Sequence, residues 1–245
     1  NPAAISGVAV TVTRNSGSAA LGGTLTVTTG SGGSATFSVL TLTGLVGNQV
    51  LTFSATGLTP AVSNAIALQA GPATQLTFTT APPASAVNGS DLAPAIVVQL
   101  RDLSGNPVAS AGVSVTATIV TGAGGVLSGT NPVSTAANGT ATFSNLRITG
   151  TVGQYTVRFS ATGISAATAN PLTLQPGAAT ALAMSTQPPP SATSGVPLSP
   201  QPAVRVVDQS GNTVTSSTAS VTASLESGPG TLGGTLTVSA VGGIA

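Results

Sequence analysis

The chain has 245 residues, of which only nine are charged: five arginines, three aspartates and one glutamate, giving a net charge of +1. Lysine, histidine, cysteine and tryptophan are absent, so no disulfide can form and no base is available for a nucleophilic triad. The same scarcity of charge excludes a nucleic-acid-binding surface, which requires clustered lysines and arginines.

Two further classes are excluded by hydrophobicity. The chain is 41% hydrophobic, whereas disordered proteins combine low hydrophobicity with high charge. Residues 15–90 carry no charge, but a membrane-spanning helix needs about 20 consecutive apolar residues. Gly, Pro, Ser, Thr and Asn interrupt every apolar run before that length. We therefore predict no membrane insertion of this segment.

An internal repeat organises the chain. The sequence RDLSGNPV at Arg101–Val108 recurs as VDQSGNTV at Val207–Val214, and LQAGPATQL at Leu68–Leu76 recurs as LQPGAATAL at Leu174–Leu182, both after 106 residues. A period of 105 to 106 residues is the size of one β-sandwich domain. We expect a partial domain at residues 1–70 without its early strands, a complete domain at 71–176, and a partial domain at 177–245 without its late strands.

Apolar and polar residues alternate with period two, which predicts strands. The inward rows are Val8, Val10 and Val12 in the first unit; Ile96, Val98 and Leu100, then Val113, Val115, Ala117 and Ile119, then Tyr155, Val157, Phe159 and Ala161 in the second; and Val204 and Val206, then Val221, Ala223 and Leu225 in the third. No stretch has the spacing of an amphipathic helix. The sequence therefore predicts an all-β fold of tandem immunoglobulin-like β-sandwiches, with about seven strands in the complete domain.

Turn residues separate these strands. An aspartate that begins a turn accepts backbone N–H bonds, while glycine and asparagine tolerate positive φ. The turn residues that we expect on this basis are Asp102, Gly105, Asn106, Asn138, Gly139, Asp208, Gly211 and Asn212. Asn138-Gly139 predicts a two-residue hairpin before Thr140–Phe143. Pro82-Pro83 and Pro188–Pro190 are expected at an edge or where the chain changes sheets.

Calcium binding is the alternative for Asp102 and Asp208. Calcium takes six to eight oxygen ligands, usually several of them from carboxylates, and the chain has four acidic residues in total. We therefore interpret both aspartates as turn caps and expect no metal or other cofactor.

Aromatic residues are the expected core anchors: Phe37, Phe53, Phe143, Tyr155 and Phe159. Gln49 stands at the position equivalent to Tyr155. Asn88-Gly-Ser and Asn138-Gly-Thr match the N-glycosylation pattern. Both are also turn sequences, and we favour the turn interpretation, with glycan decoration of the chain left open.

Three motifs resemble those of a known family. They are Asp102-x-x-Gly105-Asn106-Pro107-Val108, Gly139-x-Ala141-Thr142-Phe143 and Gly153-x-Tyr155-x-Val157-x-Phe159. They are similar to the bacterial Ig-like domains found in tandem in invasin- and intimin-type adhesins and in giant surface proteins. The resemblance implies a bacterial protein at the cell surface or outside the cell, and it carries over no adhesive residues.

These observations predict a structural, non-catalytic role in an extracellular filament or stalk. The alternative is a spacer or adhesin stalk that presents a distal enzyme, lectin or receptor-binding domain. Because few charges keep molecules apart, we expect lateral or end-to-end self-association. The two partial domains indicate either an excerpt of a longer chain or subunits that complete one another by strand complementation.

Overall fold

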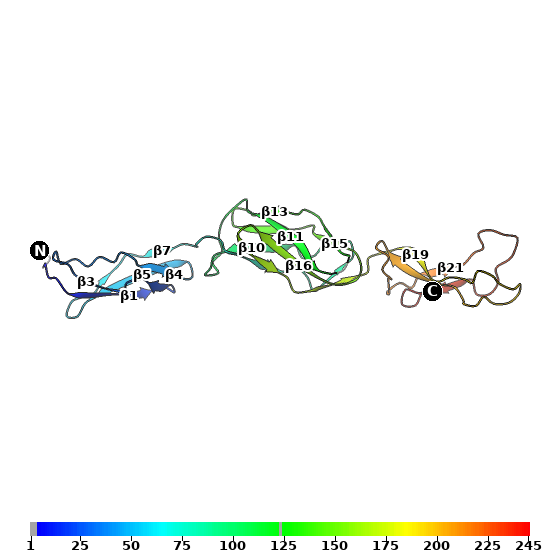
Figure 1. Cartoon of the computed structure of the whole chain (residues 1–245), viewed down its shortest axis with the longest axis horizontal. Coiled ribbons are helices and arrows are strands. Elements are labelled where there is room, and N and C mark those ends of the chain that lie inside the picture. Colours follow the sequence, from blue (N-terminus) through cyan, green and yellow to red (C-terminus); the bar gives the residue numbers. More distant parts are fainter. Residues whose placement is uncertain (1–3, 123) are drawn as a thin grey trace.

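A computed structural model describes residues 4–122 and 124–245. All regular elements in these residues are β-strands, which confirms the predicted all-β fold. No helix in the described part of the chain is long and apolar enough to cross a membrane. Figure 1 shows three groups of strands arranged end to end along the long axis. We call them the N-terminal module (β1–β7), the central module (β8–β18) and the C-terminal module (β19–β22).

The N-terminal module has one larger sheet of order β3-β1-β5-β6, in which β7 also pairs with β5, and a separate β2–β4 pair. Val12, Ala19 and Leu51 are its buried apolar residues. Its strands are β1 (Ala9–Ser16), β2 (Ala20–Gly22), β3 (Thr26–Thr28), β4 (Thr41–Thr43), β5 (Gly47–Ser54), β6 (Ala61–Val62) and β7 (Ile66–Leu68).

The central module is a sandwich of two layers of strands, which β17 joins by pairing with β16 in one layer and with β8 in the other. On one side β10 lies between β8 and β14; on the other, β16 pairs with β11 and β18, and β11 and β18 pair in turn with β13 and β9. The strands are β8 (Gln75–Thr80), β9 (Ser85–Val87), β10 (Ile96–Arg101), β11 (Ser114–Thr121), β12 (Val126–Ser128), β13 (Val133–Ser134), β14 (Thr140–Phe143), β15 (Arg147–Thr149), β16 (Gly153–Ala161), β17 (Ile164–Thr168) and β18 (Leu172–Gln175).

The core of the central module lies between these sheets. Phe159 packs edge to face against Phe78 and Phe143, with ring centroids 5.5 and 5.0 Å apart. Phe143, Tyr155 and Phe159 are at most 1% exposed. By contrast, Phe37 and Phe53 of the N-terminal module contact each other at 5.3 Å but are only half-buried. In the central module β10 pairs with β14, which contains Phe143, and Phe78 of β8 contacts Phe159. No strand among residues 4–70 corresponds to β8 or β10.

Two turn expectations have different outcomes. A turn forms at Asn138-Gly139, where Ala136 N donates to Thr140 O and Gly139 N donates to Ala136 O, both at 2.8 Å. The predicted hairpin is wrong in its strands, because β13 pairs with β11 and β14 pairs with β10. This turn carries the chain from one sheet to the other, so its flanking strands do not pair with each other. Pro82-Pro83 lies between β8, which pairs with β10 and β17, and β9, which pairs with β18. The chain changes partners there, as predicted.

The C-terminal module has two antiparallel pairs, β19–β20 and β21–β22. Residues 243–245 lie along the free edge of β20, where Val204 N donates to Ala245 O at 2.8 Å and Val206 N donates to Gly243 O at 2.8 Å. The strands are β19 (Ala179–Thr186), β20 (Ala203–Asp208), β21 (Ser220–Thr222) and β22 (Thr237–Ser239).

Candidate functional site at the module junctions

The loop after β10 is built around a buried aspartate, Asp102, which is 5% exposed. Its Oδ1 accepts hydrogen bonds from the backbone N–H groups of Ser104 at 2.9 Å and Asn106 at 2.8 Å, which closes the turn. Its Oδ2 accepts from Asn106 Nδ2 at 2.8 Å and from the backbone N–H of Gly71 at 2.9 Å. Asp102 therefore fastens the connection between two modules as well as its own turn.

Asn106 extends this network into the N-terminal module. Its Oδ1 accepts from the backbone N–H of Val46 at 2.9 Å, and its Nδ2 donates to the carbonyl of Gly44 at 2.8 Å. The side-chain amide thus bonds the loop between β4 and β5 as a neighbouring strand would. Asn106 is 3% exposed, and an amide lost from such a place leaves buried backbone groups without partners.

The second junction has the same construction 106 residues later. Asp208 Oδ1 accepts from the backbone N–H of Asn212 at 2.9 Å, and Asp208 Oδ2 accepts from that of Gly177 at 2.8 Å. Asn212 Oδ1 accepts from Val152 N at 2.9 Å, and Asn212 Nδ2 donates to Gly150 O at 2.8 Å. We call each set of contacts an Asp–Asn clasp. Sequence reasoning found the turn residues but missed their partners in the preceding module.

Asn88 adds two bonds at the second junction. Its Nδ2 donates to Asp208 Oδ2 at 2.8 Å, and its Oδ1 accepts from Gly150 N at 2.9 Å. Both polar atoms of the amide are used in this contact. Because the half-buried amide of Asn88 already bonds two residues at the junction, the contacts favour the structural interpretation of this sequence.

The hydrogen bonds also set the ionisation of the two aspartates. The bond from Asn106 lowers the pKa of Asp102; burial acts in the opposite direction, and the backbone N–H groups of Gly71, Asn106 and Ser104 lower it further. Burial acts to raise the pKa of Asp208, but bonds from Asn212, Asn88 and the backbone outweigh it and hold that pKa well below its usual range. Donors favour the charged carboxylate because they stabilise its negative charge.

Acid is therefore expected to weaken the clasps. A carboxyl group whose pKa is lower in the folded state stabilises that state above its unfolded pKa of about 4 and loses this contribution as the pH falls through the folded value. We expect the stability of the central module to be constant from pH 7 to about 5 and to decline below about 4. Urea unfolding measured over this range tests it, with Asp102→Asn as the control. The variant should be less stable at pH 7 and less sensitive to acid, and an unchanged acid response would contradict the role of Asp102.

The clasps leave little capacity for a cation. Each carboxylate faces N–H donors, which point hydrogen atoms at the oxygens that a metal would need. The described residues contain no group of three or more acidic, histidine or cysteine side chains placed to hold a metal ion.

The corner at the start of β16 in the central module is closed differently from the corner at the start of β5, the equivalent strand of the N-terminal module. In the central module Tyr155 Oη donates to the carbonyl of Thr151 at 2.7 Å. The tyrosine ring packs against Gly122, where an added Cβ would lie 2.1 Å from Tyr155 Cδ1. In the N-terminal module Gln49, 1% exposed, accepts from Ala19 N at 3.0 Å instead. Each module therefore closes this corner with a buried polar side chain of its own.

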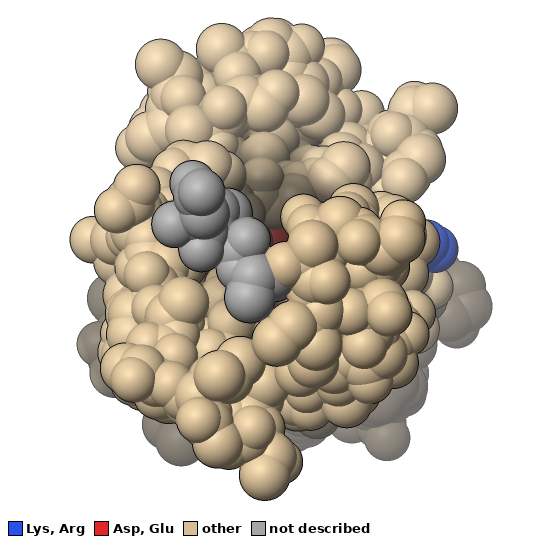
Figure 2. Space-filling model, turned by 90° about the vertical axis from the view of Figure 1, so that its left-hand side faces the viewer, with Lys and Arg blue, Asp and Glu red and all other residues tan. Residues whose placement is uncertain are grey.

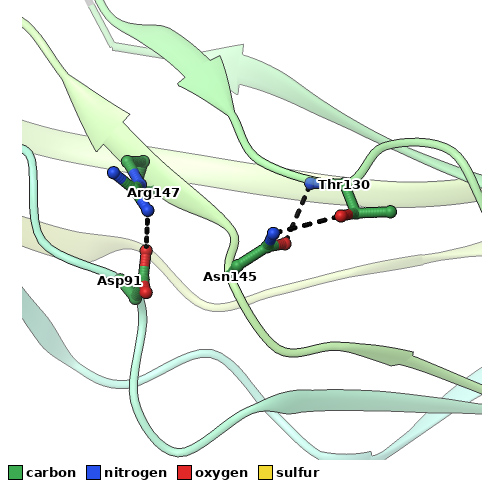
Figure 3. Close-up of polar contacts among 4 residues, drawn as sticks. All are labelled: Asp91, Thr130, Asn145 and Arg147. Atoms are coloured by element: carbon green, nitrogen blue, oxygen red, sulfur yellow. Dashed lines mark hydrogen bonds and ion pairs between the residues drawn. The ribbon is translucent and has the colours of Figure 1, made fainter.

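An exposed ion pair lies on the surface of the central module. Arg147 and Asp91 of the central module form an ion pair at 2.8 Å with side chains 43% and 46% exposed, beside the Asn145–Thr130 contact (Figure 3). An exposed pair of this kind contributes about 0–1 kcal/mol. Figure 2 shows the N-terminal end of the molecule, where the surface is almost entirely uncharged and is hollowed near its centre.

The comparisons with known proteins agree with this architecture. A family model described as SMCHD1 Ig-like domain 6 matches residues 71–172. The central module is thus an immunoglobulin-like domain, and the resemblance to Ig-like domains found from the motifs is confirmed. No curated protein matches the chain.

Several solved structures show similarity over more of the chain. The D0-D1 domain of intimin is 22% identical with a TM-score of 0.31, over 70% of this chain and 83% of that one. The Yersinia pseudotuberculosis adhesin InvE is 20% identical with a TM-score of 0.33, over 71% and 50%. The S-layer protein rSbsC is 14% identical with a TM-score of 0.27, over 95% and 28%. A Parabacteroides merdae β-glucuronidase is matched over 21% of its length. At these scores the similarities carry no functional argument.

Proposed function

We propose that this chain is part of a semi-rigid extracellular rod, a stalk or filament in which the modules themselves are the working part. The observation that carries the proposal is the repetition of the Asp–Asn clasp at both junctions, with equivalent bonds on residues 106 positions apart. Equivalent clasp contacts at successive junctions favour one repeated angle between modules.

The connecting segments are too short to act as free tethers. Six residues separate β7, which ends at Leu68, from β8, which begins at Gln75, and three separate β18 from β19. The backbone N–H of Gly71 or Gly177 is bonded to the clasp aspartate within each segment. A flexible linker reaches many orientations, whereas a segment fixed at its middle by a buried carboxylate restricts them.

Removing the clasp amides is expected to make the rod bend. Asn106→Ala and Asn212→Ala each delete two hydrogen bonds between modules, at about 0.5–1.5 kcal/mol per bond. A loss of about 1–3 kcal/mol per junction shifts a bending equilibrium about 5- to 150-fold. Small-angle X-ray scattering of the whole chain should show a smaller radius of gyration for the double variant than for the original.

Asn138→Ala is the matched control, because Asn138 lies in a turn of the central module and its side chain bonds Thr140 of the same module rather than a residue of a neighbouring one. This variant should scatter like the original chain. If all three proteins have the same scattering profile, the clasps do not determine rigidity and the proposal fails.

The same rod fits the alternative role of a spacer that holds a distal enzyme, lectin or receptor-binding domain away from a cell. Sequence on either side of this segment distinguishes the two roles. For both we propose a bacterial cell surface or the space outside the cell. With five arginines and no lysine, the chain offers few cleavage sites to trypsin-like proteases.

A further inference from the structure

The clasp asparagines bind main-chain atoms of the preceding module. Asn106 bonds the N–H of Val46 at 2.9 Å and the carbonyl of Gly44 at 2.8 Å. At the second junction Asn212 makes both bonds again, at the same 2.9 and 2.8 Å. Every residue except proline offers an N–H and a carbonyl. These bonds therefore depend on the shape of the receiving loop and not on its side chains.

The side chains of the contacting loops differ between the two junctions. The receiving loop has Leu45 at the first junction and Thr151 at the second, and the clasp turn has Leu103 at the first and Gln209 at the second. All four side chains are exposed, and Leu103 is 86% exposed. The asparagine bonds have equal lengths in spite of these differences. The contact thus accepts either an apolar or a polar residue at both positions.

The backbone shape of the receiving loop is the shared requirement. Gly44 and Gly150, whose carbonyls accept from the clasps, have φ values of +143° and +152°. A residue with a Cβ rarely adopts such values. An added Cβ on Gly150 would also lie 2.4 Å from the carbonyl oxygen of Gly124. Glycine at this position therefore directs the carbonyl toward the next module.

The central module contains both halves of the contact. Asp102 and Asn106 form the clasp at one end, and Gly150 and Val152 form the receiving loop at the other. The connecting glycine held by the clasp aspartate precedes that aspartate by 31 residues at both junctions. A second copy of residues 71–176 placed after Pro176 would therefore supply its own glycine, aspartate and asparagine at the required spacing.

We propose that the central module is complementary to itself, so that a second copy of residues 71–176 placed directly after the first docks on it with the same clasp and at the same angle. This inference rests on the proposed function, because it specifies which modules the rod accepts as neighbours. Asn106 of the following copy bonds Val152 and Gly150 of the preceding copy. The rod can then change its length by whole modules while its junctions stay the same.

Asn88 strengthens this pairing. At the second junction its Nδ2 donates to Asp208 Oδ2 at 2.8 Å and its backbone N–H donates to the carbonyl of Gln175 at 2.9 Å. Asp102 is the repeat equivalent of Asp208 and its Oδ2 has the same role toward the connecting glycine. Asn88 of the preceding copy therefore bonds Asp102 of the following copy.

Spin labelling of an extended chain tests the proposal. A second copy of residues 71–176 is inserted between Pro176 and Gly177 of the whole chain, which keeps both natural junctions. Because the chain has no cysteine, nitroxide labels can be attached at engineered ones. Leu103→Cys and Gln209→Cys in the original chain span the second junction, and Leu103→Cys in both copies of the extended chain spans the new junction. Double electron–electron resonance gives the distance distribution across each.

We expect the natural and new junctions to have the same mean distance and the same width of distribution. Asn106→Ala in the second copy alone should shift the bending equilibrium of the new junction about 5- to 150-fold toward bent forms and broaden its distribution. Asn138→Ala in the same copy is the matched control and should leave the distribution unchanged, because its side chain bonds Thr140 of its own module.

Two results overturn the proposal without touching the rod. One is a new junction with a broader distribution than the natural junction, which would mean that each junction needs its own side chains. The other is a second copy that stays unfolded, which tyrosine fluorescence detects because each copy contains Tyr155. A broad distribution across the natural junction of the original chain is a different failure. It contradicts the semi-rigid rod, and this inference with it.

Discussion

Replacing Phe159 with alanine is expected to lower the free energy of unfolding of the central module by about 3–5 kcal/mol. The side chain is 0% exposed and lies in β16, and its ring packs edge to face against Phe78 and Phe143. The truncation removes these contacts together and leaves a cavity. Strands from both sheets form the walls of that cavity, so the walls cannot collapse without shifting whole ladders.

The intact chain contains its own reporter for this measurement. Tyr155 is the single tyrosine, there is no tryptophan, and its side chain is 1% exposed in the same core. Tyrosine fluorescence during urea unfolding therefore follows the central module alone, even with the other modules present. Phe159→Ala should move this transition to lower urea. A loss under about 1 kcal/mol would show that the ring is not part of the core.

Phe53→Ala is the matched control, because Phe53 is the repeat equivalent of Phe159 in the N-terminal module and is half-buried. Distant substitutions without shared partners act independently to within about 0.5 kcal/mol. The Tyr155 transition of this variant should therefore coincide with that of the original chain. A large shift would mean that the two modules unfold as one unit.

The inner faces of the strands could be predicted because alternation with period two is a local property. Val98, Val115 and Val157 were assigned to inward rows from the residues beside them, and all three are fully buried. What covers a face is not local. The same alternation predicted an inward position for Val10, yet Val10 is only half-buried, whereas Val115 at the equivalent position of the central module is fully buried. Burial of an inward residue depends on strands far away in the sequence, which the alternation does not specify.

The clasps could not be predicted for a related reason. The sequence around Asp102 and Asn106 is fully accounted for by a turn. Nothing in it therefore indicates that Asn106 also bonds Gly44 and Val46, about 60 residues earlier. One signal was present. Gly44-x-Val46-Gly47 recurs as Gly150-x-Val152-Gly153, after the same 106 residues as the turn. Two loops that repeat together are candidates for a contact between neighbouring modules.

Gly139→Ala is expected to lower the free energy of unfolding of the central module by about 3 kcal/mol or more. Gly139 has a φ of +78°, where an L-residue costs about 1–2 kcal/mol. An added Cβ would also lie 1.9 Å from the carbonyl oxygen of Val108 and 3.0 Å from Gln99 Nε2. Because the nearest obstacle is backbone, the turn must move. That movement strains the bonds from Leu100 N to Gly139 O and from Gln99 Nε2 to Asn138 O.

Gly163→Ala separates these two costs. Gly163 has nearly the same φ, +73°, in the turn between β16 and β17, and no atom lies within 4 Å of the position of its Cβ. It should therefore show the conformational cost alone, about 1–2 kcal/mol. Both glycines belong to the central module, so Tyr155 reports both transitions. Equal losses from the two substitutions would mean that the crossing between the sheets at Asn138-Gly139 yields without strain. In that case the turn at Asn138-Gly139 would not determine the position of β14 beside β10.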